Sequence, residues 1–281
     1  MLRSMNMSTG SVLRRVLALV AVLAALSLFL GGCGRAVSGT ITEAGSTTVQ
    51  PLAERLADRY TQKHPDIQVI PGGGGTSVGI TSVKNGLVDI GAASRELKAE
   101  ESQLVKHLLA KDGIAIVTSA DNPVGGLTKD DARKIFGGLI TNWKDVGGPD
   151  HAITVVVREE GSGTRTAFEE LVMANPEPAV QVTNRALQQN TNVGIRTYVA
   201  GNRHAIGFIS FGYVDDTVKA LAIDGVETTK ENARNGTYPI VRPLYFLTKE
   251  APTGLVKQFM DFCLSAEGQA IVAEEGFISI T

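Results

Sequence analysis

A strand, a glycine turn and the start of a helix follow one another within residues 155–170, which read VVVREEGSGTRTAFEE. Three valines lead to Arg158, as a buried strand ends at the edge of a sheet. After the turn at 161–163, apolar residues recur at helical spacing over 164–173. The free N–H groups and the dipole of such a helix start attract anions, and a planar guanidinium suits tetrahedral oxyanions. The segment therefore predicts an oxyanion site.

Three common glycine-turn motifs fit this segment less well. An ordinary helix N-cap would account for the hydroxyls of Ser162 and Thr164, but not for the arginine just before the turn. The G-x-S-x-G elbow of serine hydrolases fails, because Gly161 directly adjoins Ser162. A phosphate-cradling P-loop also fails, because no Gly-Lys-Ser/Thr follows the glycines.

Similar junctions recur along the chain. Gly-Ser-Thr-Thr at 45–48 precedes a helical stripe over 49–60, and four glycines at 72–75 lead through Thr-Ser into a helical pattern over 78–85. A short apolar strand at 88–93 ends in Ser94-Arg95. Further strands are expected at 66–70 and 114–118, and a helix at 98–110. Alternating strands and helices predict an α/β sheet whose ligands gather at the carboxyl ends of the strands.

The first 32 residues have the pattern of a signal peptide. Arginines precede the apolar run at 16–30, which is short for a membrane span. The run closes in Leu-Gly-Gly-Cys, which resembles the bacterial lipobox, so Cys33 is expected to carry a lipid that anchors the protein to a membrane. A plain secretory signal with an incidental cysteine is the alternative. Residues 33–39 would then be a tether.

Charge, cysteine and histidine content argue against several classes of protein function. The net charge is −2, and the leader holds three arginines and no acid, so the remainder is more acidic still. An acidic chain is a poor candidate for nucleic-acid binding. Cys263 is the second and last cysteine; it lies in a helical pattern at 255–264 and is expected to be a buried thiol. The four histidines lack metal-site spacing, so no metal is expected.

Taken together, the motifs resemble the phosphate-binding proteins of bacterial ABC phosphate importers (PstS type). The resemblance covers residues 40–281. The motifs that carry it lie at 44–51, 72–80, 88–97, 113–118, 121–123, 135–143, 158–165, 205–208 and 235–246.

This resemblance implies a type II periplasmic-binding-protein-like fold, with two α/β lobes joined by crossover strands and the ligand in the cleft. Lobe I would comprise residues 40–117 and 243–281, and lobe II residues 118–242, with a hinge near 117–118 and 241–244. It implies high-affinity capture of inorganic phosphate outside the cytoplasm and delivery to the membrane permease of an ABC importer. No enzymatic activity and no cofactor are expected, and the protein is expected to be a monomer.

The resemblance also implies the residues of the site. The phosphate ligands would be Thr47, Thr48, Thr76, Ser94, Arg158, Ser162, Gly163 and Thr164. Further candidates are Ser46, Ser77 and Arg95. Glu160 stands where the family often has an acid that holds the arginine, and its neighbour Glu159 is the alternative.

One position departs from part of the family. Some members have an aspartate that accepts the proton of hydrogen phosphate where this chain has Ser94. A hydroxyl can donate as well as accept, so it excludes an unprotonated dianion less firmly than a carboxylate does. A receptor for sulfate, molybdate or another tetrahedral oxyanion therefore remains an alternative, as does a sensing or adhesion lipoprotein. A phosphatase would need a metal cluster or an activated nucleophile, and the sequence has the motif of neither.

Overall fold

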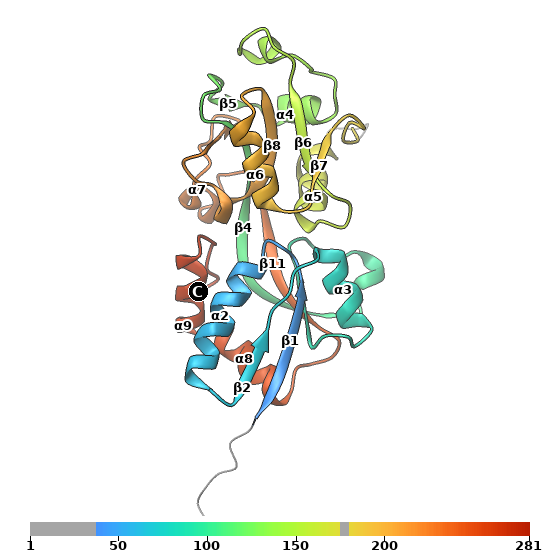
Figure 1. Ribbon diagram of the computed structural model, residues 1–281, viewed down its shortest axis with the longest axis vertical. Coiled ribbons are helices and arrows are strands. Elements are labelled where there is room, and N and C mark those ends of the chain that lie inside the picture. The colour runs from blue at the N-terminus through green and yellow to red at the C-terminus, as the bar shows by residue number, and fades with distance from the viewer. Residues whose placement is uncertain (1–37, 175–179) are drawn as a thin grey trace, which may run out of the picture. The chain divides into compact units, whose positions relative to one another are not determined.

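The computed structural model describes residues 38–174 and 180–281 (Figure 1). The predicted signal peptide and Cys33 lie outside these residues. The eleven described strands are β1 (Gly39–Gly45), β2 (Ile67–Ile70), β3 (Ile90–Ala93), β4 (Val105–Ser119), β5 (Gly126–Leu127), β6 (Thr154–Arg158), β7 (Leu187–Gln189), β8 (Ala205–Ser210), β9 (Val218–Ala220), β10 (Ala222–Ile223) and β11 (Val241–Thr248).

Helices alternate with these strands. The α-helices are α2 (Gln50–Lys63), α3 (Thr76–Lys84), α4 (Lys129–Phe136), α5 (Gly163–Phe168), α6 (Asn192–Gly201), α7 (Lys230–Arg234), α8 (Gly254–Leu264) and α9 (Ala266–Glu274). Short 3-10 segments occupy Ala99–Glu101, Trp143–Val146 and Phe211–Tyr213, and a π-helical segment, Glu169–Met173, continues α5. No helix of the two described ranges is long and apolar enough to cross a bilayer.

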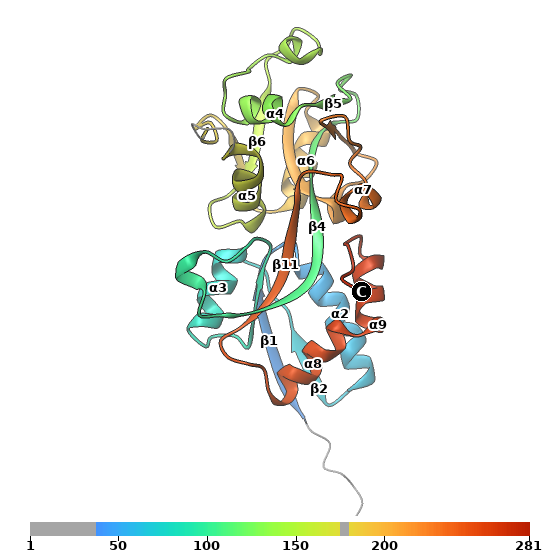
Figure 2. The same cartoon turned by 180° about the vertical axis from the view of Figure 1, so that it is seen from behind.

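Most strands belong to one mixed sheet. Its order is β2-β1-β3-β11-β4-β8-β6-β7, and β9 pairs with β4. Strands β1, β2 and β3 are parallel, as are β6, β7 and β8, whereas β11 and β4 are antiparallel to their neighbours. Both views show β4 and β11 side by side between these two parallel groups (Figures 1 and 2). The mixed α/β class and crossover strands predicted from the sequence are confirmed.

Buried apolar side chains form separate cores. One core takes its members from β4, β6, β8 and the helices between them, and it includes Trp143 and Phe168. A second is built by β1, α2 and α8 around Ile41, Leu56 and Phe259, and Cys263 is buried in it as expected. A smaller third core packs α3 against β3 and β11. Burial of this apolar surface is the main driving force for folding.

The prediction of a helix at 98–110 is wrong. Only Ala99–Glu101 is helical, and Val105 begins the long strand β4. The local sequence has good helix formers, but residues 105–113 pair antiparallel along the whole of β11. Tertiary pairing with a buried apolar strand overrides local propensity there. The other helices and strands expected from periodicity are present, with ends shifted by a few residues.

Candidate anion-binding site

Three strand ends carry the predicted polar residues into one place. Strands β1, β3 and β6 end at Gly45, Ala93 and Arg158, and helices α3 and α5 begin at Thr76 and Gly163. The loops approach so closely that a Cβ on Gly163 would collide with Thr76 and would lie 2.6 Å from Ser94 Oγ. Only glycine permits this contact between turns that lie about 70–90 residues apart in sequence.

The hydroxyl groups at these ends are buried and linked. The side chains of Thr48, Thr76, Ser94, Ser162 and Thr164 belong to residues at most 2% exposed. Thr48 Oγ1 lies 3.1 Å from Thr164 Oγ1, and Thr76 Oγ1 lies 3.4 Å from Ser94 Oγ. Ser162 caps α5 by accepting the N–H of Arg165 at 3.3 Å. Polar groups this deeply buried are costly unless they have partners, and these hydroxyls partly satisfy one another, so the cluster is a candidate binding site.

Arg158 is 1% exposed and adjoins the cluster through Thr47, the sequence neighbour of Thr48. Its Nη2 donates to Thr47 Oγ1 at 3.0 Å and to the carbonyl oxygen of Asn190 at 3.1 Å. Its Nη1 is buried and has no hydrogen-bond partner among the described residues. A buried guanidinium nitrogen without a partner costs free energy, so this atom is a candidate donor to an anion.

The acid that holds this arginine is Glu159. Its two carboxylate oxygens accept from Nε and Nη2 of Arg158, each at 2.9 Å. Glu160, which the resemblance implied for this role, is exposed. Its assignment is corrected, because the carboxylate of the residue directly after Arg158 reaches the guanidinium and Glu160 lies outside the pair.

Three further candidates have other partners. Both Nη atoms of Arg95 donate to the Glu101 carboxylate, at 2.7 and 2.8 Å, and this arginine lowers the pKa of Glu101. Ser46 Oγ accepts the N–H of Thr48 at 3.2 Å, at the start of α2. Ser77 is exposed, and its N–H donates to the carbonyl of Gly161 at 3.1 Å. Arg95 therefore belongs to an ion pair beside the cluster.

Sequence reasoning missed a buried ion pair under the cluster. Asp112 of β4 and Arg242 of β11 are direct partners in the ladder, with Nη2 and Oδ2 at 2.8 Å and both side chains at most 1% exposed. Burial raises the pKa of Asp112, whereas Arg242 and Ser210 lower it. The signal that could have found this pair is a charged residue inside the apolar run of β11.

Arg242 also reaches the cluster itself. Its Nη2 donates to Thr48 Oγ1 at 3.2 Å, and its Nη1 donates to the carbonyl oxygen of Ser94 at 3.1 Å. Asn192, the first residue of α6, donates through Nδ2 to the same Thr48 oxygen at 3.0 Å. Tyr213 donates to the carbonyl of Thr47 at 2.8 Å, and burial raises the pKa of this phenol to about 12. Arg242, Asn192 and Tyr213 were not predicted.

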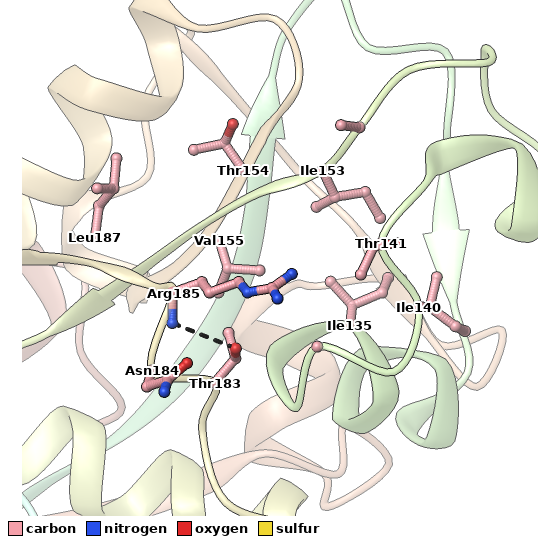
Figure 3. A pocket seen from close by; sticks show the side chains of 12 residues that line it. Ile135, Ile140, Thr141, Ile153, Thr154, Val155, Thr183, Asn184, Arg185 and Leu187 are labelled. Carbon is pink, nitrogen blue, oxygen red and sulfur yellow. Dashed lines mark hydrogen bonds between the residues drawn. The ribbon is translucent and has the colours of Figure 1, made fainter.

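A separate hollow of about 720 Å³ lies away from these residues (Figure 3). Its wall combines apolar side chains such as Ile135, Ile153 and Val155 with the exposed Arg185. It shares no residue with the hydroxyl cluster. Volume alone does not identify a site for a small anion, which needs convergent donors, so the cluster around Arg158 is the stronger candidate.

A family profile and several known proteins match this chain over most of its length. The profile of the PBP superfamily domain matches residues 34–267. The phosphate-binding protein PstS of Bacillus subtilis is 34% identical, with 94% of each chain covered. PstS of Borreliella burgdorferi is 31% identical, over 84% of this chain and 88% of its own.

Solved structures are similar as well. A Clostridium perfringens substrate-binding protein assigned to a phosphate ABC transporter, solved with bound phosphate, is 43% identical with a TM-score of 0.83, over 86% of this chain and 100% of its own. An ABC-type phosphate transport receptor from Vibrio cholerae is 39% identical with a TM-score of 0.73, over 85% and 99%.

Proposed function

Since this chain belongs to the PBP superfamily and, within it, to the family of PstS phosphate-binding proteins, we propose that it captures inorganic phosphate outside the cytoplasm. It would deliver the anion to the membrane permease of an ABC phosphate importer. The proposal rests on the relatives' named function and on the anion-binding geometry of this chain's own residues.

The observation that carries the proposal is the buried Nη1 of Arg158, which lacks a partner among the described residues. Arg158 contacts Thr47, whose neighbour Thr48 is linked to the Thr164 hydroxyl, and Thr76 and Ser94 lie against the adjoining Gly163. Arginine and hydroxyl donors together match the tetrahedral array of phosphate oxygens. Thr47, Ser162 and the backbone of Gly163 are proposed to complete the shell, because they adjoin these groups in sequence and space.

The free energy that such hydrogen bonds can supply is adequate for binding phosphate. A hydrogen bond to a charged group contributes roughly 1.5–3 kcal/mol, and micromolar affinity needs about 8 kcal/mol. Roughly six or more such bonds exceed this figure, and the cost of stripping water from the anion absorbs the surplus. Binding therefore requires no covalent step, and we propose that the protein acts without enzymatic chemistry.

Capture is proposed to involve closure of two lobes with the predicted boundaries, 40–117 with 243–281 and 118–242. Strands β4 and β11 pass between the parallel strand groups and are the natural hinge. Contacts that closure would make include Thr48–Thr164 and the bond from Ser77 N–H to the Gly161 carbonyl. A closed receptor would present a distinct surface to the permease.

We further propose that a lipid on Cys33 anchors the protein to a bacterial membrane outside the cytoplasm, at the cell surface or the periplasmic face, where it acts as a monomer. The Leu-Gly-Gly-Cys ending of the leader supports this anchor. Replacing Cys33 by alanine should release the protein from the membrane fraction into the aqueous fraction. Retention of the variant in the membrane fraction would overturn the lipid anchor.

The binding proposal is tested by calorimetric titration of residues 34–281 with phosphate and then with sulfate near neutral pH. Tight one-to-one phosphate binding with no heat from sulfate is expected. Equal binding of sulfate would favour a general oxyanion receptor, for which Ser94 in place of a carboxylate is the supporting observation. Binding of neither anion would overturn the receptor and favour a sensing or adhesion protein.

A further inference from the structure

The carbonyl group of Thr47 has no donor within its own turn. In a helical turn a carbonyl accepts the N–H of the residue four positions later, and for Thr47 that residue is Pro51, which has no N–H. The N–H groups of Val49 and Gln50 both donate to the Ser46 carbonyl, at 3.0 and 2.9 Å. The sequence of this turn therefore leaves the Thr47 carbonyl for a donor from elsewhere in the chain.

Tyr213 supplies that donor from the short 3-10 segment after β8. Its phenol donates to the Thr47 carbonyl oxygen at 2.8 Å, across 166 residues of sequence. Burial raises the pKa of Tyr213 to about 12, so the phenol keeps the proton that it donates at neutral pH. An uncharged donor of this kind places no negative charge beside the candidate anion site.

Tyr213 is itself held in place by Arg196 of α6. Nη1 of Arg196 donates to the Tyr213 carbonyl oxygen at 3.1 Å and pairs with the Asp215 carboxylate at 2.9 Å. These two contacts tie the segment after β8 to α6, the helix whose first residue, Asn192, donates to the Thr48 hydroxyl. The phenol is therefore presented to Thr47 from a fixed support.

Thr47 is thus held twice by residues from the other proposed lobe. Arg158 donates to its hydroxyl at 3.0 Å, and Tyr213 donates to its carbonyl. Thr47 lies in proposed lobe I, whereas both donors lie in proposed lobe II. From this geometry we propose that Tyr213 is a positioning residue that latches the closed lobes through the Thr47 carbonyl and slows the release of phosphate. The inference rests on the proposed function.

The latch acts on release because its bond joins two protein groups and leaves the anion out. Phosphate enters while the lobes are apart, before the bond from Tyr213 to Thr47 has formed, so the bond has little effect on the association rate. Release requires the lobes to part, which breaks this bond. Tyr213 therefore contributes to affinity through the dissociation rate.

The test is the Tyr213→Phe variant, which removes the phenolic hydroxyl and keeps the ring. Calorimetry measures its phosphate affinity near neutral pH, and stopped-flow release into an excess of a fluorescent phosphate sensor measures the dissociation rate. Because the Thr47 carbonyl then faces carbon in the closed form, dissociation should be about five- to tenfold faster, and affinity should fall by the same factor. Tyr198→Phe removes the same hydroxyl from α6 and should behave as wild type.

A second variant tests the reason for the latch. Pro51→Ala provides an N–H four residues after Thr47, so the carbonyl gains a donor within its own turn. In that background Tyr213→Phe should accelerate phosphate dissociation by a clearly smaller factor, because the carbonyl is no longer left without a partner. The comparison of the two factors cancels any direct effect of Pro51→Ala on the start of α2.

Three results would overturn the inference. They are a wild-type dissociation rate in Tyr213→Phe, a loss of affinity that arises from slower association alone, and an equal acceleration with Pro51 and with alanine at position 51. Wild type that fails to bind phosphate would instead overturn the proposed function itself.

Discussion

Glu159 accepts from both Nε and Nη2 of its sequence neighbour Arg158, each at 2.9 Å, which leaves Nη1 on the opposite side of the guanidinium. The carboxylate therefore sets the direction in which the arginine presents its remaining donor. Glu159→Gln should weaken phosphate binding about tenfold, because a neutral amide orients the guanidinium less firmly than a charged pair does. Titration calorimetry measures this change.

Glu160→Gln is the matched control, since it removes the same charge one residue further on. Its phosphate affinity should stay within about twofold of wild type, because the exposed Glu160 lies outside the ion pair. Weak binding by Glu160→Gln with normal binding by Glu159→Gln would reverse the assignment made from the structure.

Arg158→Lys keeps the positive charge but loses the planar fork. A single ammonium cannot hold Glu159, Thr47 and an anion with the geometry of the guanidinium. We expect phosphate affinity to fall on the order of 100-fold, equivalent to about two lost increments of ~1.4 kcal/mol. Arg55→Lys, on the exposed face of α2, should bind normally. Wild-type phosphate affinity in Arg158→Lys would show that the Arg158 guanidinium does not take part in binding.

Glu43 should make stability depend on pH. It is 2% exposed, and burial raises its pKa from 4.5 to about 8, against a smaller opposing effect of the Gly72 backbone. Between these values the folded state keeps a proton that the unfolded state releases, so the free energy of unfolding falls as pH rises. The contribution of Glu43 protonation to the free energy of unfolding is present in full below pH 4.5. On the order of 5 kcal/mol of it is lost by the time the pH passes 8.

Glu43→Gln removes this titration. Denaturant unfolding should show that the variant gains on wild type as the pH is raised from about 5 toward about 9. A difference between Glu43→Gln and wild type that is constant over this range would contradict the buried, proton-binding carboxyl.

Variants of the buried ion pair Asp112–Arg242 distinguish its contribution to folding stability from its contribution to phosphate binding. Asp112→Asn leaves the Arg242 charge uncompensated and should lower the free energy of unfolding by about 3–5 kcal/mol. The double variant Asp112→Leu/Arg242→Met removes both charges and should recover much of that loss in denaturant unfolding. The phosphate affinity of the double variant should nevertheless stay below that of wild type, because Thr48 and Ser94 lose the donors of Arg242. Normal affinity in the double variant would show that Arg242 matters for stability alone.

Much of the fold could be predicted from the sequence, because amphipathic periodicity and glycine turns report local structure. The stripe of α2 and the strand–turn–helix around Arg158 are clear examples. The helix expected at 98–110 was wrong, since pairing with β11 is not visible in the local pattern. Long-range pairing of this kind overrides intrinsic propensity.

The candidate site was predictable to a similar degree. Residues at strand ends and helix starts, such as Thr76 and Thr164, could be named as candidates from their position in the sequence and from the family resemblance, and their role in binding stays a prediction. Arg242, Asp112 and Asn192 could not, because their role arises from three segments that meet only in the folded chain. The choice between Glu159 and Glu160 depended on side-chain direction, which adjacent residues do not share.

The central claim is tested most directly by a crystal structure of the protein with phosphate at neutral pH. We predict one phosphate within hydrogen-bond distance of Arg158 Nη1 and the Thr164 hydroxyl, with a further oxygen near Ser94 and Thr76. The interaction of Arg158 with Glu159 should be retained in that structure. Phosphate bound in the hollow around Arg185, with Arg158 Nη1 left without an anion, would contradict the claim (Figure 3).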